Sequence, residues 1–263
     1  ITGNHSIAID NQGNGYVSEY LNHGIRKISP PDHNATTFST GLTNPTGICI
    51  APDGNLYVTK FYEGNVTRIT PVGAKTVVQS GFNRPCAVAV DGTGTMWVAN
   101  TYSSQIIRIG QDQVRHTWWN IQANHIALGP NGDLYVANQA DQTIRRIGAN
   151  DPVSPIGQVV VVAGNPLQKG YRDGLANQSL LEDISGIAVG PTGNVYVADN
   201  GMIRLISSEG IVSTIAGKPG EFGFIDGQVK KARFQNIGGL ALDQNGNLWL
   251  AQRDKAVRLI TNV

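Results

Sequence analysis

Polar side chains recur at one equivalent position in six segments of this 263-residue chain. They are Glu19, Lys60, Asn100, Asn138, Asp199 and Gln252, and beside them lie the aromatic residues Tyr20, Phe61, Tyr62 and Tyr102. Aromatic faces with neighbouring amides and carboxylates suit sugar rings, peptides or exposed protein loops. We therefore predict that these ten residues form a ligand-binding site. The alternative is that each polar side chain caps its own segment by binding backbone amides of a loop.

Catalysis would need a sharper constellation than the sequence contains. No Ser-His-Asp or Cys-His pairing, phosphate-binding loop or zinc-spaced cysteine set is present, so no catalytic residue is assigned. His5 and His125 occupy similar places in the first and fourth segments and could share a zinc or calcium ion, with Glu19 and Asp199 as further candidates. Because the two histidines differ by one position in register, we expect a strand of period two to point them in opposite directions.

These residues belong to a repeat of about forty residues that runs along the whole chain. Every copy starts from an apolar residue: Ile7, Ile48, Val88, Ile126, Ile187 and Leu240. A glycine follows at a fixed offset, and an aromatic residue comes three positions later, as in Gly13 with Tyr16 and Gly246 with Trp249. A third segment surrounds an arginine with apolar residues, as in Ile25–Ile28. The sequence therefore predicts a repeat protein.

The segments of each copy are short, rich in Val, Ile, Tyr and Thr, and bounded by Gly, Pro, Asn or Asp, which predicts strands. The glycines supply the positive φ that a tight hairpin needs. A fourth strand is predicted after five copies, at 36–40, 75–79, 114–119, 159–163 and 211–216. Four antiparallel strands repeated six times predict an all-β, six-bladed β-propeller.

We expect one β-propeller domain over residues 1–263, because no linker of shifted composition interrupts the repeat. The sixth copy ends at Ile260, three residues before the last residue of the sequence. Either the last blade is incomplete, with three strands and a stub from residues 1–3, or the chain is part of a longer protein. We favour the second.

Composition excludes some functions. The net charge of +1 argues against nucleic acid and anionic membrane surfaces as partners. No apolar run approaches the length that crosses a bilayer. Low charge with many Asn, Thr and Gly residues favours an extracytoplasmic location: secreted, periplasmic or in an ectodomain. The arginines of the third strands are expected to pack their stems along the blades with solvated charged groups.

Two long linkers, 163–174 and 216–227, together with the segments Gly193–Asp199 and Ile25–Ile28, resemble the NHL repeat. The resemblance covers essentially the whole chain and implies a six-bladed propeller. NHL propellers include protein-binding, RNA-binding and carbohydrate-associated modules and a few enzymes. Peptide-amidating lyases of related fold hold zinc with histidines near the positions of His5 and His125. Lactonase-type propellers bind metal through residues chemically similar to Glu19, Asn100, Asn138 and Asp199, but their flanking motifs do not match this sequence.

Strand direction sorts the loops onto two faces. If the first strand of each copy runs from top to bottom, constant turns such as 52–55 lie below, and the variable second-to-third loops and linkers lie above. Variable loops are where a scaffold carries specificity. We predict a non-catalytic module that recognises a protein, peptide or carbohydrate on the top face. The alternative is a metal-dependent lyase or lactonase-like hydrolase with one divalent cation at the mouth of the central channel.

Overall fold

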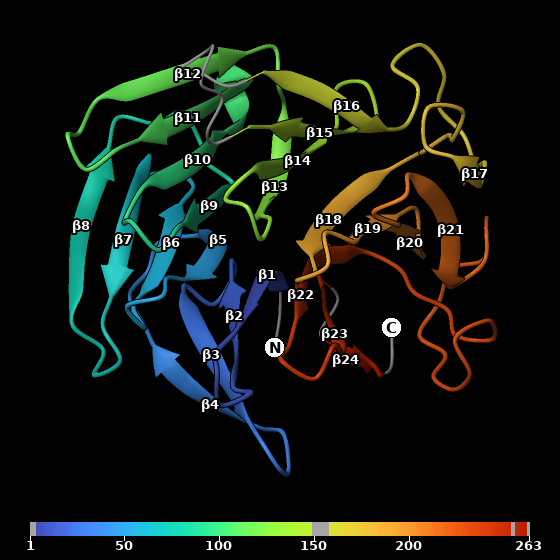
Figure 1. Cartoon of the computed structure of the whole chain (residues 1–263). Coiled ribbons are helices and arrows are strands. Elements are labelled where there is room, and N and C mark those ends of the chain that lie inside the picture. The colour runs from blue at the N-terminus through green and yellow to red at the C-terminus, as the bar shows by residue number, and fades with distance from the viewer. Residues whose placement is uncertain (1–3, 149–157, 254–255, 262–263) are drawn as a thin grey trace.

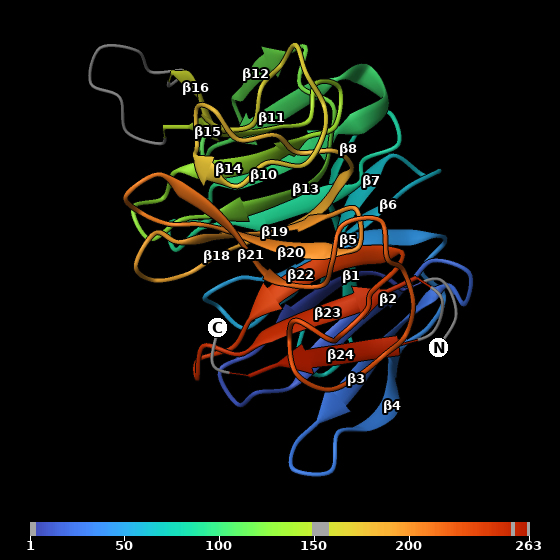
Figure 2. The ribbon, with the colours of Figure 1, turned by 90° about the vertical axis from the view of Figure 1, so that its right-hand side faces the viewer.

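The chain forms six antiparallel sheets around a central axis (Figure 1). This computed structural model describes residues 4–148, 158–253 and 256–261. Seen from the side, the strands run between the two faces of a disc (Figure 2). The prediction of an all-β, six-bladed propeller is therefore confirmed.

The first three blades each contain four strands in sequence order. Blade 1 has β1 (Asn4–Ile9), β2 (Gly15–Glu19), β3 (Gly24–Ser29) and β4 (Asn34–Ser39). Blade 2 has β5 (Pro45–Ile50), β6 (Leu56–Lys60), β7 (Asn65–Ile69) and β8 (Lys75–Ser80). Blade 3 has β9 (Ala87–Val90), β10 (Met96–Asn100), the 3₁₀ turn η1 (Thr101–Ser103), β11 (Gln105–Ile109) and β12 (Arg115–Trp119).

The last three blades differ in strand number. Blade 4 has β13 (Ala123–Leu128), β14 (Leu134–Asn138), β15 (Thr143–Ile147) and β16 (Val159–Ala163). Blade 5 has β18 (Ile184–Val189), β19 (Val195–Asp199), β20 (Met202–Ile206) and β21 (Ile211–Ala216), with β17 (Gly174–Leu175) paired outside β21. Blade 6 has β22 (Ile237–Leu242), β23 (Leu248–Gln252) and β24 (Ala256–Ile260). Within the described ranges the last blade is thus three-stranded, as expected, and the predicted stub of residues 1–3 lies outside them.

Glycine fixes the turn between the first and second strands of every blade. The six turn glycines have positive φ: Gly13 at 79°, Gly54 at 78°, Gly94 at 81°, Gly132 at 80°, Gly193 at 84° and Gly246 at 77°. In blade 1 the Asp10 carboxylate accepts hydrogen bonds from the backbone N–H groups of Gln12 (2.9 Å) and Asn14 (2.8 Å). These turns satisfy their own polar groups, which agrees with a structural role for the bottom face.

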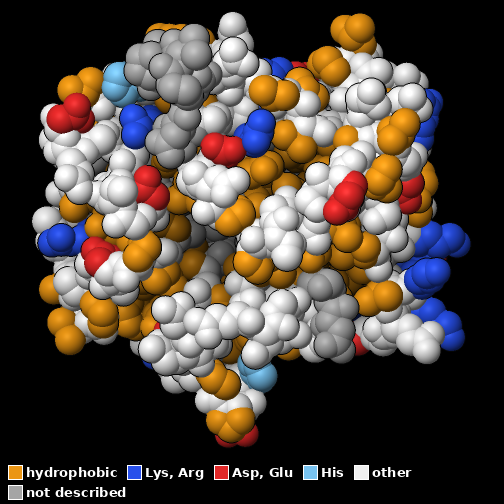
Figure 3. Space-filling view, viewed as in Figure 1, with side chains coloured by type: hydrophobic (Ala, Val, Ile, Leu, Met, Phe, Trp, Pro, Cys, Tyr) orange, Lys and Arg blue, Asp and Glu red, His pale blue; other side chains and the backbone are white. Residues whose placement is uncertain are grey.

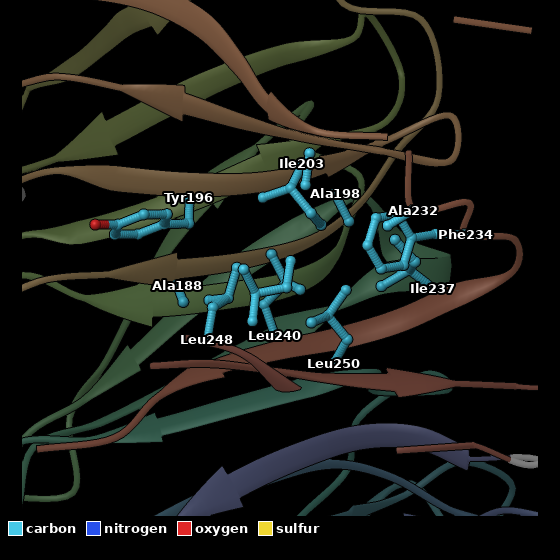
Figure 4. Close-up of a cluster of buried hydrophobic side chains, with 12 residues drawn as sticks. Ala188, Tyr196, Ala198, Ile203, Ala232, Phe234, Ile237, Leu240, Leu248 and Leu250 are labelled. Atoms are coloured by element: carbon cyan, nitrogen blue, oxygen red, sulfur yellow. The ribbon is translucent and has the colours of Figure 1, made fainter. Parts of the chain in front are cut away.

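The core lies between neighbouring blades. Figure 4 shows side chains of blades 5 and 6 pointing toward one another, among them Tyr196, Leu240 and Leu250. Leu248 and Leu250 are fully buried. Burying a side chain of this kind stabilises the fold by about 1.5–3 kcal/mol. Radial stacking of the sheets therefore supplies the hydrophobic stabilisation.

The first strands of the blades approach one another closely around the axis. The residue before the reference apolar residue is small in five blades and histidine in blade 4: Ser6, Gly47, Ala87, His125, Gly186 and Gly239. A Cβ atom on Gly47 would lie 2.4 Å from the Cα atom of Ala87 and 2.6 Å from the carbonyl oxygen of Cys86. Glycine is required there because the backbones of blades 2 and 3 leave no space for a methyl group.

A β-bulge interrupts the top of five inner strands. The register shifts lie between Asn4 and Ser6 in β1, Pro45 and Ile48 in β5, Ala123 and His125 in β13, Ile184 and Gly186 in β18, and Ile237 and Gly239 in β22. A bulge inserts an extra residue and disturbs the alternation of side chains along the strand. The side chains on the two sides of a bulge therefore do not alternate strictly between the two faces of the sheet.

Replacing Gly47 with alanine should reduce the free energy of unfolding by about 1–3 kcal/mol, because the new methyl group overlaps backbone atoms of blade 3. Gly92→Ala is the matched control: its φ is not positive, and the nearest atom to an added Cβ is Pro52 Cγ at 4.0 Å. Urea unfolding followed by tryptophan fluorescence measures both. Equal stability of the two variants would contradict the close approach of the inner strands.

Candidate ligand-binding site

The six recurring polar residues lie at the top ends of the second strands, and all six side chains are buried. Asn100 Oδ1 accepts a hydrogen bond from the backbone N–H of Asn83 (2.6 Å), and Asn138 Oδ1 accepts one from Gln122 (2.9 Å). Gln252 Nε2 donates to the carbonyl oxygen of Gln235 (2.7 Å). These bonds favour the alternative that the sequence left open, in which the residues cap incoming linkers. Direct ligand contact by the polar ring stays a prediction.

Asp199 holds the linker that enters blade 5. Its Oδ1 accepts hydrogen bonds from the backbone N–H groups of Glu182 (2.9 Å) and Asp183 (3.0 Å), and its Oδ2 accepts one from Arg204 Nη1 (2.7 Å). Burial raises the pKa of Asp199, while these backbone groups and Arg204 act in the opposite direction. Arg204 has no exposed side-chain surface and also binds Asp173 (2.8 Å). The expectation of a solvated guanidinium is wrong for Arg204, because the blade 5 linker covers it.

Lys60 and Glu19 complete the polar ring. Lys60 pairs with Glu63 in its own loop, and this hydrogen bond lowers the pKa of Glu63. Glu19 is 4% exposed, and its Oε1 has no hydrogen-bond partner among residues 4–148, 158–253 and 256–261. Neither side chain is presented to solvent, so an incoming ligand would meet other groups first.

The structure brings the four predicted aromatic residues together in one cluster, which we call the aromatic patch: Tyr20, Phe61, Tyr62 and Tyr102. The centroid of the Phe61 ring lies 5.9 Å from that of Tyr20, 5.0 Å from that of Tyr62 and 5.5 Å from that of Tyr102, each at near-perpendicular geometry. Tyr62 and Tyr102 are 62% and 55% exposed. Two large aromatic side chains are therefore exposed on the top of blades 2 and 3.

Arg84 lies over this patch. Its guanidinium carbon is 4.6 Å from the Tyr102 ring centroid and 5.7 Å from those of Phe61 and Tyr62. The residue has a left-handed φ of 48°, a backbone conformation that residues other than glycine adopt only at a cost in free energy. The position of Arg84 over the aromatic rings was not anticipated from the sequence.

His5 and His125 meet at the channel mouth. Their ring centroids are 6.0 Å apart at an interplanar angle of 23°, and the His5 ring centroid lies 6.2 Å from that of Tyr20. The expectation that the two histidines point in opposite directions is wrong. The bulges in β1 and β13 break the period of two on which it depended.

Both imidazoles are held neutral. Burial lowers the pKa of His5 to about 3, and the charge of Arg253 adds to this effect. Burial, His5 and Arg253 lower the pKa of His125 well below 6.5. Within the described part of the chain, His5 Nδ1 and His125 Nε2 have no hydrogen-bond partner. A base with so low a pKa abstracts protons poorly at neutral pH.

A polar cavity of about 490 Å³ opens on the top of blades 4 to 6. We call it the amide cavity because five of its lining residues carry amide side chains: Asn124, Gln139, Asn200, Gln235 and Asn236. Arg253, Asp183, Ser185 and Phe222 also line it. Asn124 and Ser185 are bulge residues, which sequence reasoning missed. The only signal for them was that the residue two positions before the reference apolar residue varies between copies.

A larger cavity, of about 810 Å³, lies on the opposite face between blades 1 and 2. Its wall contains the hairpin residues Asp10, Asn14 and Pro52. The Asp10 carboxylate binds Gln12 and Asn14 of its own turn, and Tyr16 donates to it (3.3 Å). Because these polar groups are already paired, we place the candidate site on the top face despite the smaller volume.

Several classes of site find no support. Among the described residues, no group of three or more His, Cys, Asp or Glu side chains is placed to hold a metal ion. In the same part of the chain no helix is long and apolar enough to span a membrane. On the face seen in Figure 3, charged side chains are scattered except for basic ones at one edge. That face offers no basic platform for nucleic acid.

No protein-family model matches the chain, so the NHL assignment is not confirmed. Among curated proteins, the chain is 27% identical over 256 residues to the chloroplastic protein SUPPRESSOR OF QUENCHING 1 of Arabidopsis thaliana, covering 92% of this chain and 23% of that protein. It is 27% identical over 206 residues to Teneurin-3 of Danio rerio, covering 76% and 6%. The chain thus spans less than a quarter of these relatives.

Solved structures share the fold. An auxiliary nutrient binding protein from Bacteroides thetaiotaomicron superposes with a TM-score of 0.81 at 19% identity, covering 98% of this chain and 69% of the other. A streptogramin B lyase superposes with a TM-score of 0.68 at 15% identity, covering 99% of this chain and 94% of the other. A gluconolactonase from Xanthomonas campestris superposes with a TM-score of 0.73 at 13% identity, covering 98% of this chain and 85% of the other. At these identities the likeness establishes the propeller fold alone, which hosts both binding proteins and enzymes.

Acidification should destabilise the protein through the two mouth histidines. The unfolded chain takes up protons near pH 6.5, whereas folded His5 stays neutral down to about pH 3. The unfolded state therefore binds more protons below pH 6.5, and stability falls there by up to about 1.4 kcal/mol per pH unit for each histidine. Urea unfolding at pH 7, 6 and 5 should show a shallower pH dependence in His125→Gln than in the unmodified chain.

His33→Asn is the control for this experiment, because His33 is exposed and its φ of 53° suits asparagine. It should keep the full pH dependence. If the free energy of unfolding fell equally steeply with pH in His125→Gln and His33→Asn, the mouth histidines would not be the buried neutral groups described above.

Proposed function

We propose that this chain is a non-catalytic binding module that recognises a glycan on its top face. The observation that carries the proposal is the pairing of an exposed aromatic patch with an amide-lined cavity on either side of the channel mouth. His5 joins the two, since it contacts Tyr20 of the patch and His125, the neighbour of Asn124 in the cavity wall. Because these contacts form one series, a single extended ligand could engage both parts.

The chemistry of both parts suits sugars. The flat faces of Tyr62 and Tyr102 offer apolar area with little side-chain entropy to lose. Amide side chains donate and accept hydrogen bonds, which matches a ligand rich in hydroxyl groups. Only two charged residues, Asp183 and Arg253, line the cavity among the described ones. The match to a nutrient binding protein supports a binding role without naming the ligand.

A protein or peptide partner is the second ligand class for the same surface. Peptide recognition commonly uses an exposed sheet edge or an apolar groove, whereas the top face consists of loops and a polar cavity. This difference favours the glycan. We also propose that the chain is an NHL-type propeller and works outside the cytoplasm; the linker pattern supports the first, and the low charge supports the second.

An enzymatic role is the rival, and the meeting of His5 and His125 favours it. Each imidazole has a ring nitrogen free of protein hydrogen bonds within the described residues, and neutral imidazole is the form that binds zinc. Two nitrogens are fewer than the three protein ligands of a usual catalytic zinc site. Asp199, considered as a further ligand, is occupied by Arg204 and two backbone N–H groups.

Tyr62→Ala and Tyr102→Ala should each weaken glycan binding by about tenfold or more, because each removes an exposed ring face from the patch. A glycan array identifies the ligand, and calorimetry then measures affinity. Trp119→Ala is the matched control, since Trp119 is 65% exposed but lies on the outer strand β12. The top-face assignment would be overturned if Trp119→Ala lost affinity, or if the two tyrosine variants kept the affinity of the unmodified protein.

Zinc and calcium titrations of the purified protein separate the two roles. The binding module should retain no tightly held ion, because two histidines alone bind weakly. A single ion that survives dialysis and is lost in both His5→Ala and His125→Ala would favour the enzyme. His23→Ala, in an exposed loop, controls for adventitious binding.

A further inference from the structure

Arg84 is held where a ligand on the aromatic patch must meet it. Its guanidinium lies within 5.7 Å of the centroids of three rings, and the residue is exposed. Within residues 4–148, 158–253 and 256–261 it forms no salt bridge, whereas Lys60, the residue before Phe61, is paired with Glu63. Stacking on the rings orients the planar cation but leaves its N–H donors free for an anion.

Arg253 places a second guanidinium on the other side of the mouth. It is exposed and lines the amide cavity, and no carboxylate of the described chain forms a salt bridge with it. Its charge acts on His5, His125 and Cys86. Cys86 in turn donates to the carbonyl oxygen of Arg84 (3.7 Å). Both cations therefore border the channel mouth.

The acidic groups of this region do not cancel both cations. Glu63 is paired with Lys60, Asp199 is paired with Arg204, and Glu19 is buried. Asp183 lines the amide cavity together with Arg253, so its negative charge offsets part of the positive charge of Arg253 there. The positive charge is therefore least compensated at the patch, around Arg84.

We infer that the glycan bound by this face is acidic, a carboxylated oligosaccharide with one sugar stacked on Tyr62 and Tyr102 and its carboxylate on Arg84. A second carboxylate along the same oligosaccharide lies near Arg253. This inference rests on the proposed glycan-binding function and adds the charge of the ligand to it. An arginine beside an aromatic ring distinguishes an acidic sugar from a neutral one. The carboxylate of an acidic sugar pairs with the guanidinium, whereas a neutral sugar removes water from the guanidinium and leaves it unpaired.

Oligogalacturonate and its methyl ester form a matched pair of probes, since esterification removes the charge and keeps the sugar backbone. Calorimetry at low salt should give at least about tenfold tighter binding of the acid than of the ester. Arg84→Gln and Arg253→Gln should each reduce this ratio by weakening the binding of the acid. The affinity for the ester should not fall, because the ester leaves the guanidinium unpaired in the unmodified protein. Raising the ionic strength should weaken only the binding of the acid.

Arg115→Gln is the control. Arg115 is also exposed and also lies over an aromatic ring, 4.9 Å from the Phe82 centroid, but it sits on the outer strand β12. It should leave both affinities unchanged. Circular dichroism and urea unfolding of each variant confirm that the fold is intact.

The outcomes separate the inference from the proposed function. Equal binding of acid and ester, or a ratio unchanged by Arg84→Gln, would overturn the acidic ligand while leaving a glycan module in place, provided that binding still depended on Tyr102. If no probe on a glycan array bound, both proposals would fall. Selective binding of acidic peptides would overturn the proposal of a glycan ligand and would leave only the role of the two arginines in binding an anion.

Discussion

The close approach of the six inner strands around the axis is the constraint on which the rest of the structure depends. At Gly47 the backbone of the next blade leaves no room for a Cβ atom, and a Cβ atom would lie 3.2 Å from its nearest neighbour at Gly186 and 3.0 Å at Gly239. Small residues let the sheets converge, and convergence brings the apolar faces of neighbouring blades into contact. His125 occupies the same position with a large side chain, and its ring lies beside Gly239. Because Gly239 has no side chain, there is room beside it for the imidazole of His125.

The two faces of the disc use their polar groups differently. On the bottom, turn carboxylates such as Asp10 bind their own hairpins, so the face is uniform and internally satisfied. On the top, Asn100, Asn138, Asp199 and Gln252 bind the linkers. Asn100 binds the backbone of Asn83 in the linker that carries Arg84, and Lys60 pairs with Glu63 across the loop that carries Tyr62. The polar ring thus supports the surface that we propose for binding, and aromatic and cationic side chains form that surface.

The repeat predicted the fold well, because hairpin glycines and apolar alternation are local signals. Fourth strands such as β16 and β21 have the predicted bounds. The site was predicted only in part. Aromatic residues at strand ends were sufficient to anticipate the patch, whereas the meeting of His5 and His125 depends on two β-bulges that break the strand period. The burial of Arg204 depends on a long linker packed over blade 5. Neither long-range effect is encoded in the spacing of one repeat.

Hydrogen exchange of the protein with and without oligogalacturonate tests the central claim most directly, because it reports which face meets the ligand. The account predicts slower exchange at the top loops 61–64, 83–86 and 101–104, with no change at the bottom turns 52–55 and 191–194. Protection confined to the bottom turns would contradict it.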